Sequence, residues 1–306
     1  MSLDINAPLY RWNSSDLIGY GSFGRVYRGY DLNNTPVAVK ILHSCDCDIP
    51  EYRREFDYNE FNREVDIISK IQHPNICQLL YVNKNPNYMV FEYCSQGNLY
   101  EVLYSKKMKG GLASKYIKLD LIKKKPEKYG FIELSFKERV SFSIDICRAL
   151  VWLHQHYIFH QDIKPANILV TGDKRCKLCD FGTAKYSEDK NSISNPDLDG
   201  SPAYQAPEIF NGTKITEHSE VYAFAITMWE IFTQDISWKG HDNEDIHIFA
   251  INNGDRPPLS SSPDYPNVRI DSRVVNILEK SWNCEQMKRL LFSEILELLK
   301  ELVEKE

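Results

Sequence analysis

The sequence predicts an α+β fold in which a small sheet-rich part precedes a larger, mainly helical part. Residues 16–94 contain short alternating or apolar runs separated by turns, which is typical of β-strands. Apolar residues recur at helical spacing in residues 134–156, 219–230 and 290–303. Strands that come before helices along the chain, instead of alternating with them, favour a segregated sheet and helices.

Composition narrows the class of protein. The 306 residues are 42% hydrophobic and 26% charged, so the chain can bury a core without disulfides. A net charge of −6 argues against a general nucleic-acid binder. The eight cysteines are scattered, and Cys45/Cys47 and Cys176/Cys179 lack the further ligands of a zinc site. Without a signal peptide or an apolar run of about 18 residues, we expect no membrane span and a reducing, cytoplasmic setting, with nuclear entry open.

A glycine-rich hairpin is expected near the N-terminus. Residues 1–15 are polar and unpatterned, and we expect them to form an N-terminal extension. Gly19, Gly21 and Gly24 then form a G-x-G-x-x-G pattern, which alone is weak evidence. The residues after it alternate like a strand and turn into a second strand that ends at Lys40. This excludes a helix N-terminus and predicts a flap whose bare backbone can approach phosphates closely.

The middle of the chain predicts a helix, a buried strand and a basic segment. Residues 61–70 share a helical face, and residues 88–94 read as a buried strand. A lysine-rich insertion is expected at about residues 104–132, where residues 101–130 hold nine lysines against three acidic residues. We expect a solvated loop there, and the alternative is a docking strip for an acidic partner, an anionic membrane or an import receptor.

The stretch from Ile158 to Gly182 carries groups suited to phosphate chemistry. After the helix predicted at 134–156, a small hairpin is expected to bring its two ends together. Asp162 can accept a proton from an attacking hydroxyl, and Lys164 can neutralise charge on a transferring group. Asn167 and Asp180 offer the hard oxygen ligands that Mg²⁺ prefers beside phosphates.

These residues resemble the protein kinase family, whose catalytic loop reads His-Arg-Asp-x-Lys-x-x-Asn and is followed by Asp-Phe-Gly. One position departs from the pattern, because Gln161 stands where the family has arginine. The matching residues are His160, Asp162, Lys164, Asn167, Asp180, Phe181 and Gly182.

The resemblance implies a bilobal kinase domain over residues 16–304, with an N-lobe at 16–94, a C-lobe at 95–304 and ATP with Mg²⁺, or Mn²⁺, between them. It pairs Lys40 with an acidic residue of the first helix, either Glu64 or, as the runner-up, Glu60. Phe91 would close the rear of the adenine pocket. The implied catalytic set is Asp162, Lys164, Asn167, Asp180, Lys40 and Glu64, with Asn167 and Asp180 as metal ligands. The implied nucleotide-binding set is Ile18, Gly19, Gly21, Gly24, Val26, Ala38, Lys40, Glu92, Cys94 and Leu169, where Glu92 and Cys94 would act through their backbone.

Further motifs resemble the serine/threonine type. The run Gly200–Glu208 resembles the peptide-positioning loop of that type, and Ser201 is expected to contact the catalytic residues. Glu208 would be paired with Arg289, a buried architectural pair. The runs at 253–258 and around Trp282 look like the tyrosine-kinase-like group of serine/threonine kinases.

Two departures leave alternatives open. Gln161 cannot grip a phosphate as an arginine does, so we predict activity without phosphorylation of the segment after Asp180. Glu220 replaces the aspartate that normally caps the catalytic loop, and the two changes are expected to be mutually adjusted. A catalytically weak kinase-like scaffold is the competing function, and tyrosine or dual specificity is the third. The serines of that segment are Ser187, Ser192 and Ser194.

Overall fold

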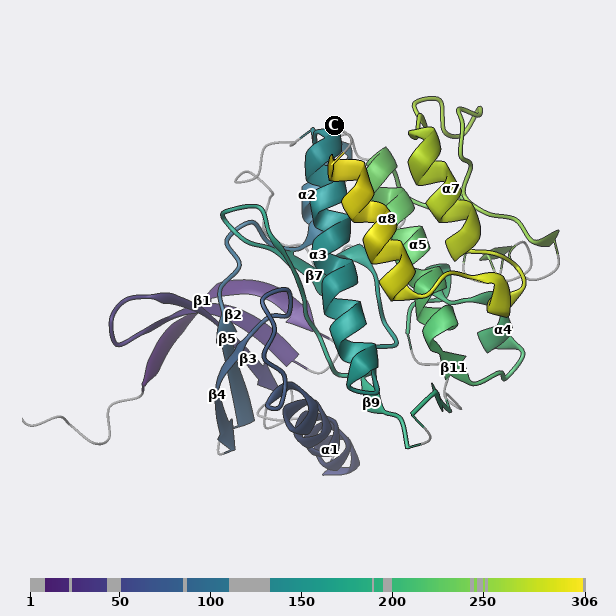
Figure 1. The fold of residues 1–306 in the computed structure, drawn as a ribbon. Helices are drawn as coiled ribbons and strands as arrows, with labels where there is room; N and C mark the ends of the chain where they lie inside the picture. Colours follow the sequence, from purple (N-terminus) through teal and green to yellow (C-terminus); the bar gives the residue numbers. More distant parts are fainter. Residues whose placement is uncertain are drawn as a thin grey trace, which may run out of the picture.

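The N-terminal part of the structure is a five-stranded antiparallel sheet, and the C-terminal part is mainly helical (Figure 1). This computed structural model describes residues 9–21, 24–42, 51–84, 87–109, 133–188, 190–194, 200–242, 245–246, 250 and 253–304. The predicted α+β class is confirmed. The strands of the sheet are β1 (Tyr10–Gly21), β2 (Gly24–Asp31), β3 (Pro36–Leu42), β4 (Leu79–Lys84) and β5 (Asn87–Glu92).

The strand order β1-β2-β3-β5-β4 places β3 in the middle of the sheet. Lys40 of β3 therefore lies opposite Val26 on one side and Met89 on the other. Ala38, two residues earlier and on the same face, lies opposite Phe91. The register thus places three of the predicted nucleotide-binding residues on neighbouring strands.

The expected N-terminal extension of residues 1–15 is too long. Strand β1 already begins at Tyr10, and residues 10–12 pair with residues 29–31 of β2. Tyr10 and Trp12 pack against Tyr81 and Tyr88 on the outer face of the sheet, with ring centroids 5.5 and 5.1 Å apart. The aromatic pairs explain why a polar-looking segment joins the sheet.

Gly24 begins β2, where the sheet leaves no space for a side chain. A Cβ atom at this position would lie only 2.2 Å from the carbonyl oxygen of Ile41. Gly19, by contrast, has open space where a side chain would be. The sheet itself therefore requires Gly24, whereas the packing of the protein does not explain Gly19.

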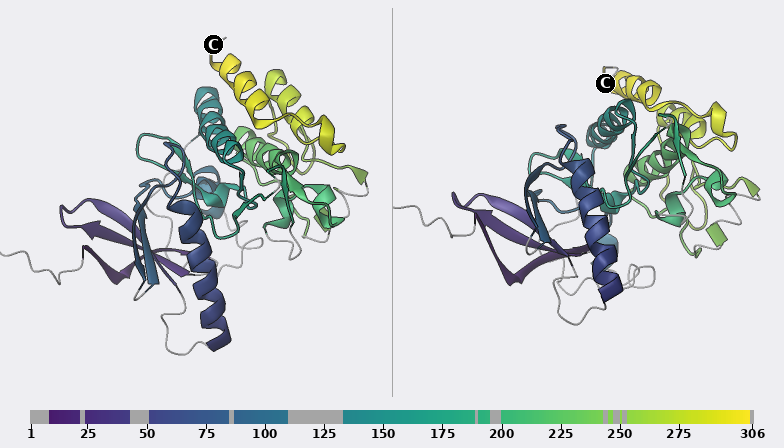
Figure 2. Two further views of the ribbon diagram at one scale, coloured as in Figure 1. Left: turned by 60° about the horizontal axis from the view of Figure 1, so that its bottom comes forward. Right: turned by 90° about the horizontal axis from the view of Figure 1, so that it is seen from below.

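Helix α1 (Glu51–Ile68) lies beside the sheet, on the side of the helical lobe (Figure 2). It is longer than the predicted 61–70 segment and includes the charged run at 51–55. Phe61 packs with Leu42 and Met89 of the sheet. This contact fixes the helix and with it the direction of Glu64, one turn further along the helix.

The helical lobe is built on α3 and α5, which are buried against each other and against α8. Its helices are α2 (Leu99–Lys109), α3 (Phe136–Gln155), α4 (Pro207–Phe210), α5 (Glu217–Thr233), α7 (Ser272–Ser281) and α8 (Phe292–Glu304). Its short strands are β6 (Ile158–Phe159), β7 (Ile168–Val170), β8 (Cys176–Leu178), β9 (Lys185–Tyr186), β10 (Ser192–Ile193) and β11 (Ile215–Thr216), and its 3₁₀ turns are η4 (Pro165–Asn167), η5 (Pro202–Tyr204) and η7 (Gln286–Lys288).

The helix predicted at 134–156 is confirmed as α3. It begins after Ser135, whose hydroxyl accepts a hydrogen bond from the backbone N–H of Glu138, while the Glu138 carboxylate accepts one from the Ser135 backbone N–H. This reciprocal capping satisfies two donors at the helix start. The predicted hairpin is also present as β7 and β8, with Ile168 opposite Leu178.

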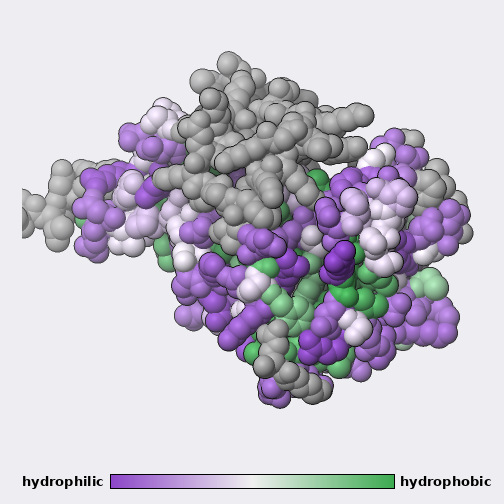
Figure 3. All heavy atoms as spheres, turned by 90° about the horizontal axis from the view of Figure 1, so that it is seen from above, coloured by the Kyte–Doolittle hydropathy of each residue, from purple (hydrophilic) through white to green (hydrophobic). Residues whose placement is uncertain are grey.

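Most of the lysine-rich insertion, residues 110–132, lies outside the described residues, so the solvated loop expected there and its alternative, a docking strip, stay predictions. Its first residues, up to Lys109, belong to α2. Figure 3 shows that the described surface on the upper face is mainly hydrophilic around a central group of hydrophobic side chains. Across the described part of the chain, no helix combines the length and the apolar character that a membrane crossing requires.

Candidate active site

A cleft with a cavity of about 200 Å³ opens between the inner face of the sheet and the β7–β8 hairpin. Residues of the sheet line one side of the cleft as its roof, and residues in and next to the hairpin line the other side as its floor. The predicted residues that line it are Gly19, Val26, Ala38, Lys40, Glu64, Phe91, Asn167, Leu169 and Asp180.

Some predicted nucleotide-binding residues lie outside this lining. Ile18 is 47% exposed on β1, and Gly24 lies against β3. The cleft also has lining residues that the sequence analysis missed. Ala166 and Cys179 adjoin motif residues, so their place could have been inferred, whereas Ile68 and Cys77 reach the cleft only through the fold. The predicted residues outside the lining are Ile18, Gly21, Gly24, Glu92 and Cys94, and those missed are Tyr20, Ile68, Cys77, Ala166 and Cys179.

Lys40 and Glu64 are buried and form an ionic cluster in the cleft with Asp180, whose side chain is 29% exposed. The Lys40 ammonium donates to both carboxylate oxygens of Glu64 at 2.8 Å and to Asp180 Oδ1 at 3.2 Å. Burial alone would lower the pKa of Lys40, but the negative charges of Glu64 and Asp180 outweigh it and raise that pKa. The charge of Lys40 in turn holds the pKa of Asp180 below its usual value, against the effect of burial. Both groups therefore stay charged at neutral pH.

Glu64, and not the runner-up Glu60, is the partner of Lys40. Glu60 lies one turn earlier on α1 and accepts a hydrogen bond from Arg63 instead. Arg63 also donates to the backbone carbonyl of Gly182, at 2.6 Å.

Asp162 is oriented by two neighbours in the loop after β6. Its Oδ2 accepts hydrogen bonds from Lys164 Nζ at 2.6 Å and from Asn167 Nδ2 at 2.8 Å. Its other oxygen, Oδ1, is buried and has no hydrogen-bond partner among the described residues. Asn167 also donates to the Asp162 backbone carbonyl at 2.9 Å, and it is one of the residues that line the cleft.

His160 braces the loop, as predicted. It is fully buried, its Nε2 is 3.0 Å from the carbonyl oxygen of Cys179, and its Nδ1 accepts from the backbone N–H of Asp162 at 3.3 Å. Its ring also meets Phe181 edge-on, at a centroid distance of 5.0 Å. His160 thus connects Asp162 to the backbone just before Asp180, and the two carboxylates keep a fixed relation.

Comparison with known proteins decides the family. The family described as "Protein tyrosine and serine/threonine kinase" matches residues 13–299. The chain belongs to the protein kinase family. Curated relatives include the dual specificity protein kinase shkC of Dictyostelium discoideum, 31% identical over 94% of this chain and 50% of that protein. The serine/threonine-protein kinase CTR1 of Arabidopsis thaliana is 30% identical over 98% of this chain and 32% of its own length.

A viral relative matches over more of its own length. The serine/threonine-protein kinase-transforming protein mos of a myeloproliferative sarcoma virus is 27% identical over 89% of this chain and 75% of that protein. The kinase described here thus spans about half the length of shkC and about a third of CTR1.

The two departures from the family pattern, Gln161 and Glu220, are not joined by a hydrogen bond between their side chains. Glu220 on α5 accepts a hydrogen bond from the backbone N–H of Gln161 at 2.6 Å, and its other oxygen is 2.6 Å from His154 Nε2. The extra methylene of Glu220 is therefore accommodated, and its bond to the loop does not depend on which side chain residue 161 carries. The Gln161 amide instead donates to the carbonyl oxygen of Thr183.

Glu92, which is expected to act through its backbone, also makes contacts with its side chain. Its carboxylate accepts hydrogen bonds from the Gln78 backbone N–H and from Lys177 Nζ, both at 2.8 Å. Lys177 lies on β8, so this ion pair connects the end of β5 to the β7–β8 hairpin below the cleft. Sequence reasoning missed the pair because its members are 85 positions apart.

The loop at 200–208 lies beside the catalytic residues. Ser201 Oγ accepts from Lys164 Nζ at 2.6 Å, which confirms one of its expected contacts. The pair at the end of the loop is confirmed as well, because Arg289 Nη1 and Nη2 donate to the two carboxylate oxygens of Glu208 at 2.7 and 2.8 Å. The arginine side chain is completely buried.

Proposed function

We propose that this chain transfers the γ-phosphoryl group of ATP to serine or threonine hydroxyls of protein substrates. The observation that carries the proposal is the asymmetry of Asp162. Two donors hold one carboxylate oxygen, and the other is buried without a partner in the described chain. A buried acceptor without a partner is costly, and the hydroxyl of a bound substrate would satisfy it.

The residues of the chain then have separate parts in the transfer. Asp162 Oδ1 orients the hydroxyl and takes up its proton, while Lys164, which also bonds Ser201, carries positive charge beside it. Lys40, held by Glu64, presents its ammonium to the phosphates below the sheet. Because each charge is fixed by a partner before substrate binds, little reorganisation is needed during the reaction.

The cleft residues fit a nucleotide with Mg²⁺. Val26, Ala38 and Leu169 form apolar surfaces above and below the place of the base, and Gly19 leaves open space near the roof. Asp180 and the Asn167 amide oxygen are hard oxygen donors beside Lys40, as a magnesium-bound triphosphate requires. When bound, Mg²⁺ supplies charge neutralisation between the phosphates. We propose Mg²⁺ as the metal, with Mn²⁺ as the substitute.

Serine or threonine specificity is supported by the Ser201–Lys164 contact and by the names of two relatives, CTR1 and mos, as serine/threonine kinases. The relative shkC is named a dual specificity kinase, so tyrosine transfer is an outcome that the experiment must be able to detect.

The test measures transfer from labelled ATP with Mg²⁺ to a generic protein substrate. We expect Asp162→Asn and Lys40→Met to lower the rate by at least about 100-fold, since a positioned base and a fixed phosphate ligand each contribute on that scale. The exposed Lys288→Met is the matched lysine control and should keep full activity. Phosphoamino-acid analysis of the product should give phosphoserine and phosphothreonine. Equal labelling by the parent and both site variants would refute the proposal and favour a scaffold.

A further inference from the structure

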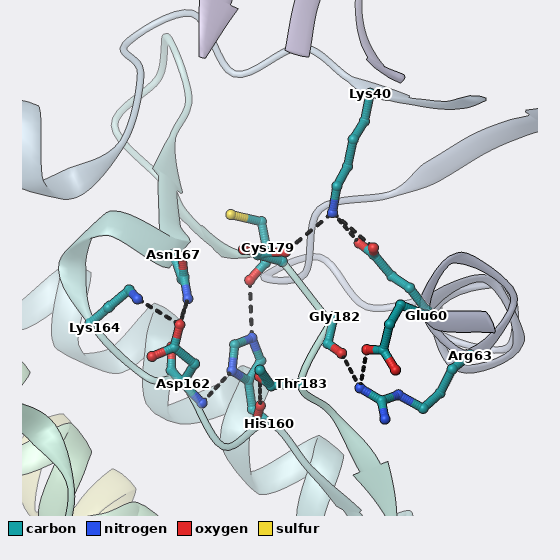
Figure 4. Close-up of polar contacts among 12 residues, drawn as sticks. Lys40, Glu60, Arg63, His160, Asp162, Lys164, Asn167, Cys179, Gly182 and Thr183 are labelled. Atoms are coloured by element: carbon teal, nitrogen blue, oxygen red, sulfur yellow. Dashed lines mark hydrogen bonds and ion pairs between the residues drawn. The ribbon is translucent and has the colours of Figure 1, made fainter. Parts of the chain in front are cut away.

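Two consecutive carbonyl groups just after Asp180 are held by side chains from different parts of the chain. The guanidinium of Arg63, on α1, donates to the carbonyl oxygen of Gly182 at 2.6 Å (Figure 4). The side-chain amide of Gln161, in the catalytic loop, donates to the carbonyl oxygen of Thr183. The two donors lie 119 and 22 positions away from their acceptors, so the contacts are tertiary.

This backbone needs to be held, because Asp180 adopts an unfavourable conformation. Its φ angle is +62°, in the left-handed region. For a residue with a Cβ atom, this conformation costs roughly 1–2 kcal/mol and persists only where the surroundings impose it. Gly182 and Thr183 lie two and three residues after Asp180. Hydrogen bonds to their carbonyl groups therefore restrict the backbone conformation of the segment that follows Asp180.

Both donors are themselves anchored. Gln161 is buried, with 7% exposure, and its backbone N–H bonds the Glu220 carboxylate of the central helix α5. Arg63 is oriented by Glu60 and directly precedes Glu64, the partner of Lys40. One donor is therefore fixed to the core of the helical lobe, and the other to the helix beside the sheet.

Together with Lys40, the Arg63 and Gln161 side chains hold Asp180 and the backbone that follows it. Lys40 holds its carboxylate from the sheet, and the pair of donors holds its backbone from below and from α1. Neither donor requires a group added to the chain. Gln161 is uncharged, so burying it avoids the cost of desolvating a cation there.

We propose that Arg63 and Gln161 are positioning residues that hold the backbone after Asp180, so that its carboxylate stays directed into the cleft. The inference rests on the proposed function, because Asp180 matters there as a ligand of the magnesium-bound nucleotide. It adds that the arrangement is maintained by two unmodified side chains, one from each lobe.

The first test is hydrogen exchange of the whole chain, without nucleotide or metal. The backbone N–H of Ala184 bonds the Phe181 carbonyl, and that of Ser187 bonds the Tyr157 carbonyl, so peptides over 181–188 report on this segment. We expect Arg63→Met and Gln161→Gly each to raise their exchange rate by about tenfold or more, with α5 peptides unchanged. Glycine tolerates the φ of +67° at position 161, so an increase there reflects the lost amide and not added strain.

Two further variants separate positioning from general structure. Asn62→Ala is the control on α1 and should leave exchange unchanged, because among the described residues the side chain of Asn62 donates to the Tyr58 carbonyl of the same helix. Arg63→Lys keeps a donor and should recover at least half of the protection lost in Arg63→Met. In activity assays, Arg63→Met and Gln161→Gly should lower kcat and raise the Mg²⁺ concentration for half-maximal rate several-fold, with KM for ATP changed less than twofold.

The proposal is overturned if exchange over 181–188 is unchanged in both variants, or if it rises equally in all peptides. It is also overturned if Arg63→Lys behaves as Arg63→Met does, or if KM for ATP rises in step with the Mg²⁺ requirement. A parent protein that transfers no phosphate would refute the proposed function alone, because the exchange experiment contains no substrate.

Discussion

Replacing Arg289 by methionine should destabilise the kinase strongly, because this arginine is buried with a full set of partners. Its side chain bonds both oxygens of Glu208, the His218 carbonyl at 3.1 Å and the Asn283 carbonyl at 2.8 Å. Its guanidinium also lies 5.1 Å from the ring centroid of Tyr222. Methionine fills similar volume but leaves a carboxylate that is only 16% exposed without its counter-charge.

Breaking a buried pair by removing one member costs about 3–5 kcal/mol. For 306 residues the entropy of unfolding at the midpoint is roughly 640 cal/mol/K, at about 2.1 cal/mol/K for each residue. The expected fall in Tm is therefore about 5–8 °C. Because Glu208 ends the loop that carries Ser201, the variant should also raise the KM for a protein substrate more than the KM for ATP.

Thermal unfolding followed by circular dichroism measures the first effect, and initial rates at varied substrate measure the second. Lys288→Met is the matched control, since that neighbouring lysine is 62% exposed and should give no measurable shift in Tm. Arg289→Lys should lie between the parent and Arg289→Met, because an ammonium keeps the charge but cannot donate along two parallel directions. A fall in Tm for Arg289→Met no larger than that of the control would refute the reasoning.

Three further predictions follow from single contacts. Replacing Ser187, Ser192 and Ser194 together by alanine should leave phosphotransfer within a few-fold of the parent rate, and loss of activity in a folded protein would contradict this. Glu92→Ala should weaken ADP binding several-fold in calorimetry and destabilise the protein by about 1–2 kcal/mol, while Glu92→Gln, which keeps an acceptor, should do less. In urea unfolding, the stability difference between the parent and Lys40→Met should shrink as pH falls below about 4. The charge of Lys40 lowers the pKa of the aspartate beside it, so this contact gives stability that is complete above the ordinary pKa of 3.8 and is lost as pH falls.

An element of the fold could be predicted where the pattern that defines it lies within its own residues. Helix α3 has both apolar periodicity and a capping pair, and its limits differ from the predicted 134–156 by two residues at the start and one at the end. The start of β1 could not be predicted in this way. Tyr10 and Trp12 are isolated aromatic residues in a polar segment, and they become partly buried because Tyr81 and Tyr88 lie on the same face. A strand whose side-chain contacts lie some 70 positions away shows no local pattern.

In the candidate site, too, one part could be predicted from the sequence and the other could not. The sequence indicates the motif residues because phosphate chemistry needs particular groups at close spacing, and Asp162, Lys164 and Asn167 lie in one short segment and hydrogen bond with one another. The contacts that hold these groups in place could not be predicted from the sequence. The Glu92–Lys177 ion pair and the Arg63 contact with Gly182 join residues on different elements, and no spacing rule predicts such pairs.

The glutamine at position 161 changes what the side chain of this residue can bind. It does not change the backbone hydrogen bond that connects the catalytic loop to α5. The loop is connected to α5 through the backbone N–H of residue 161, so any side chain there would keep that bond to Glu220. The side chain then decides what lies beside the segment after Asp180. An arginine would place a cation there, and a cation is stable in a nearly buried site only with an anion such as a phosphate beside it. The amide nitrogen donates to a backbone carbonyl that is always present, so this hydrogen bond forms in the unmodified chain.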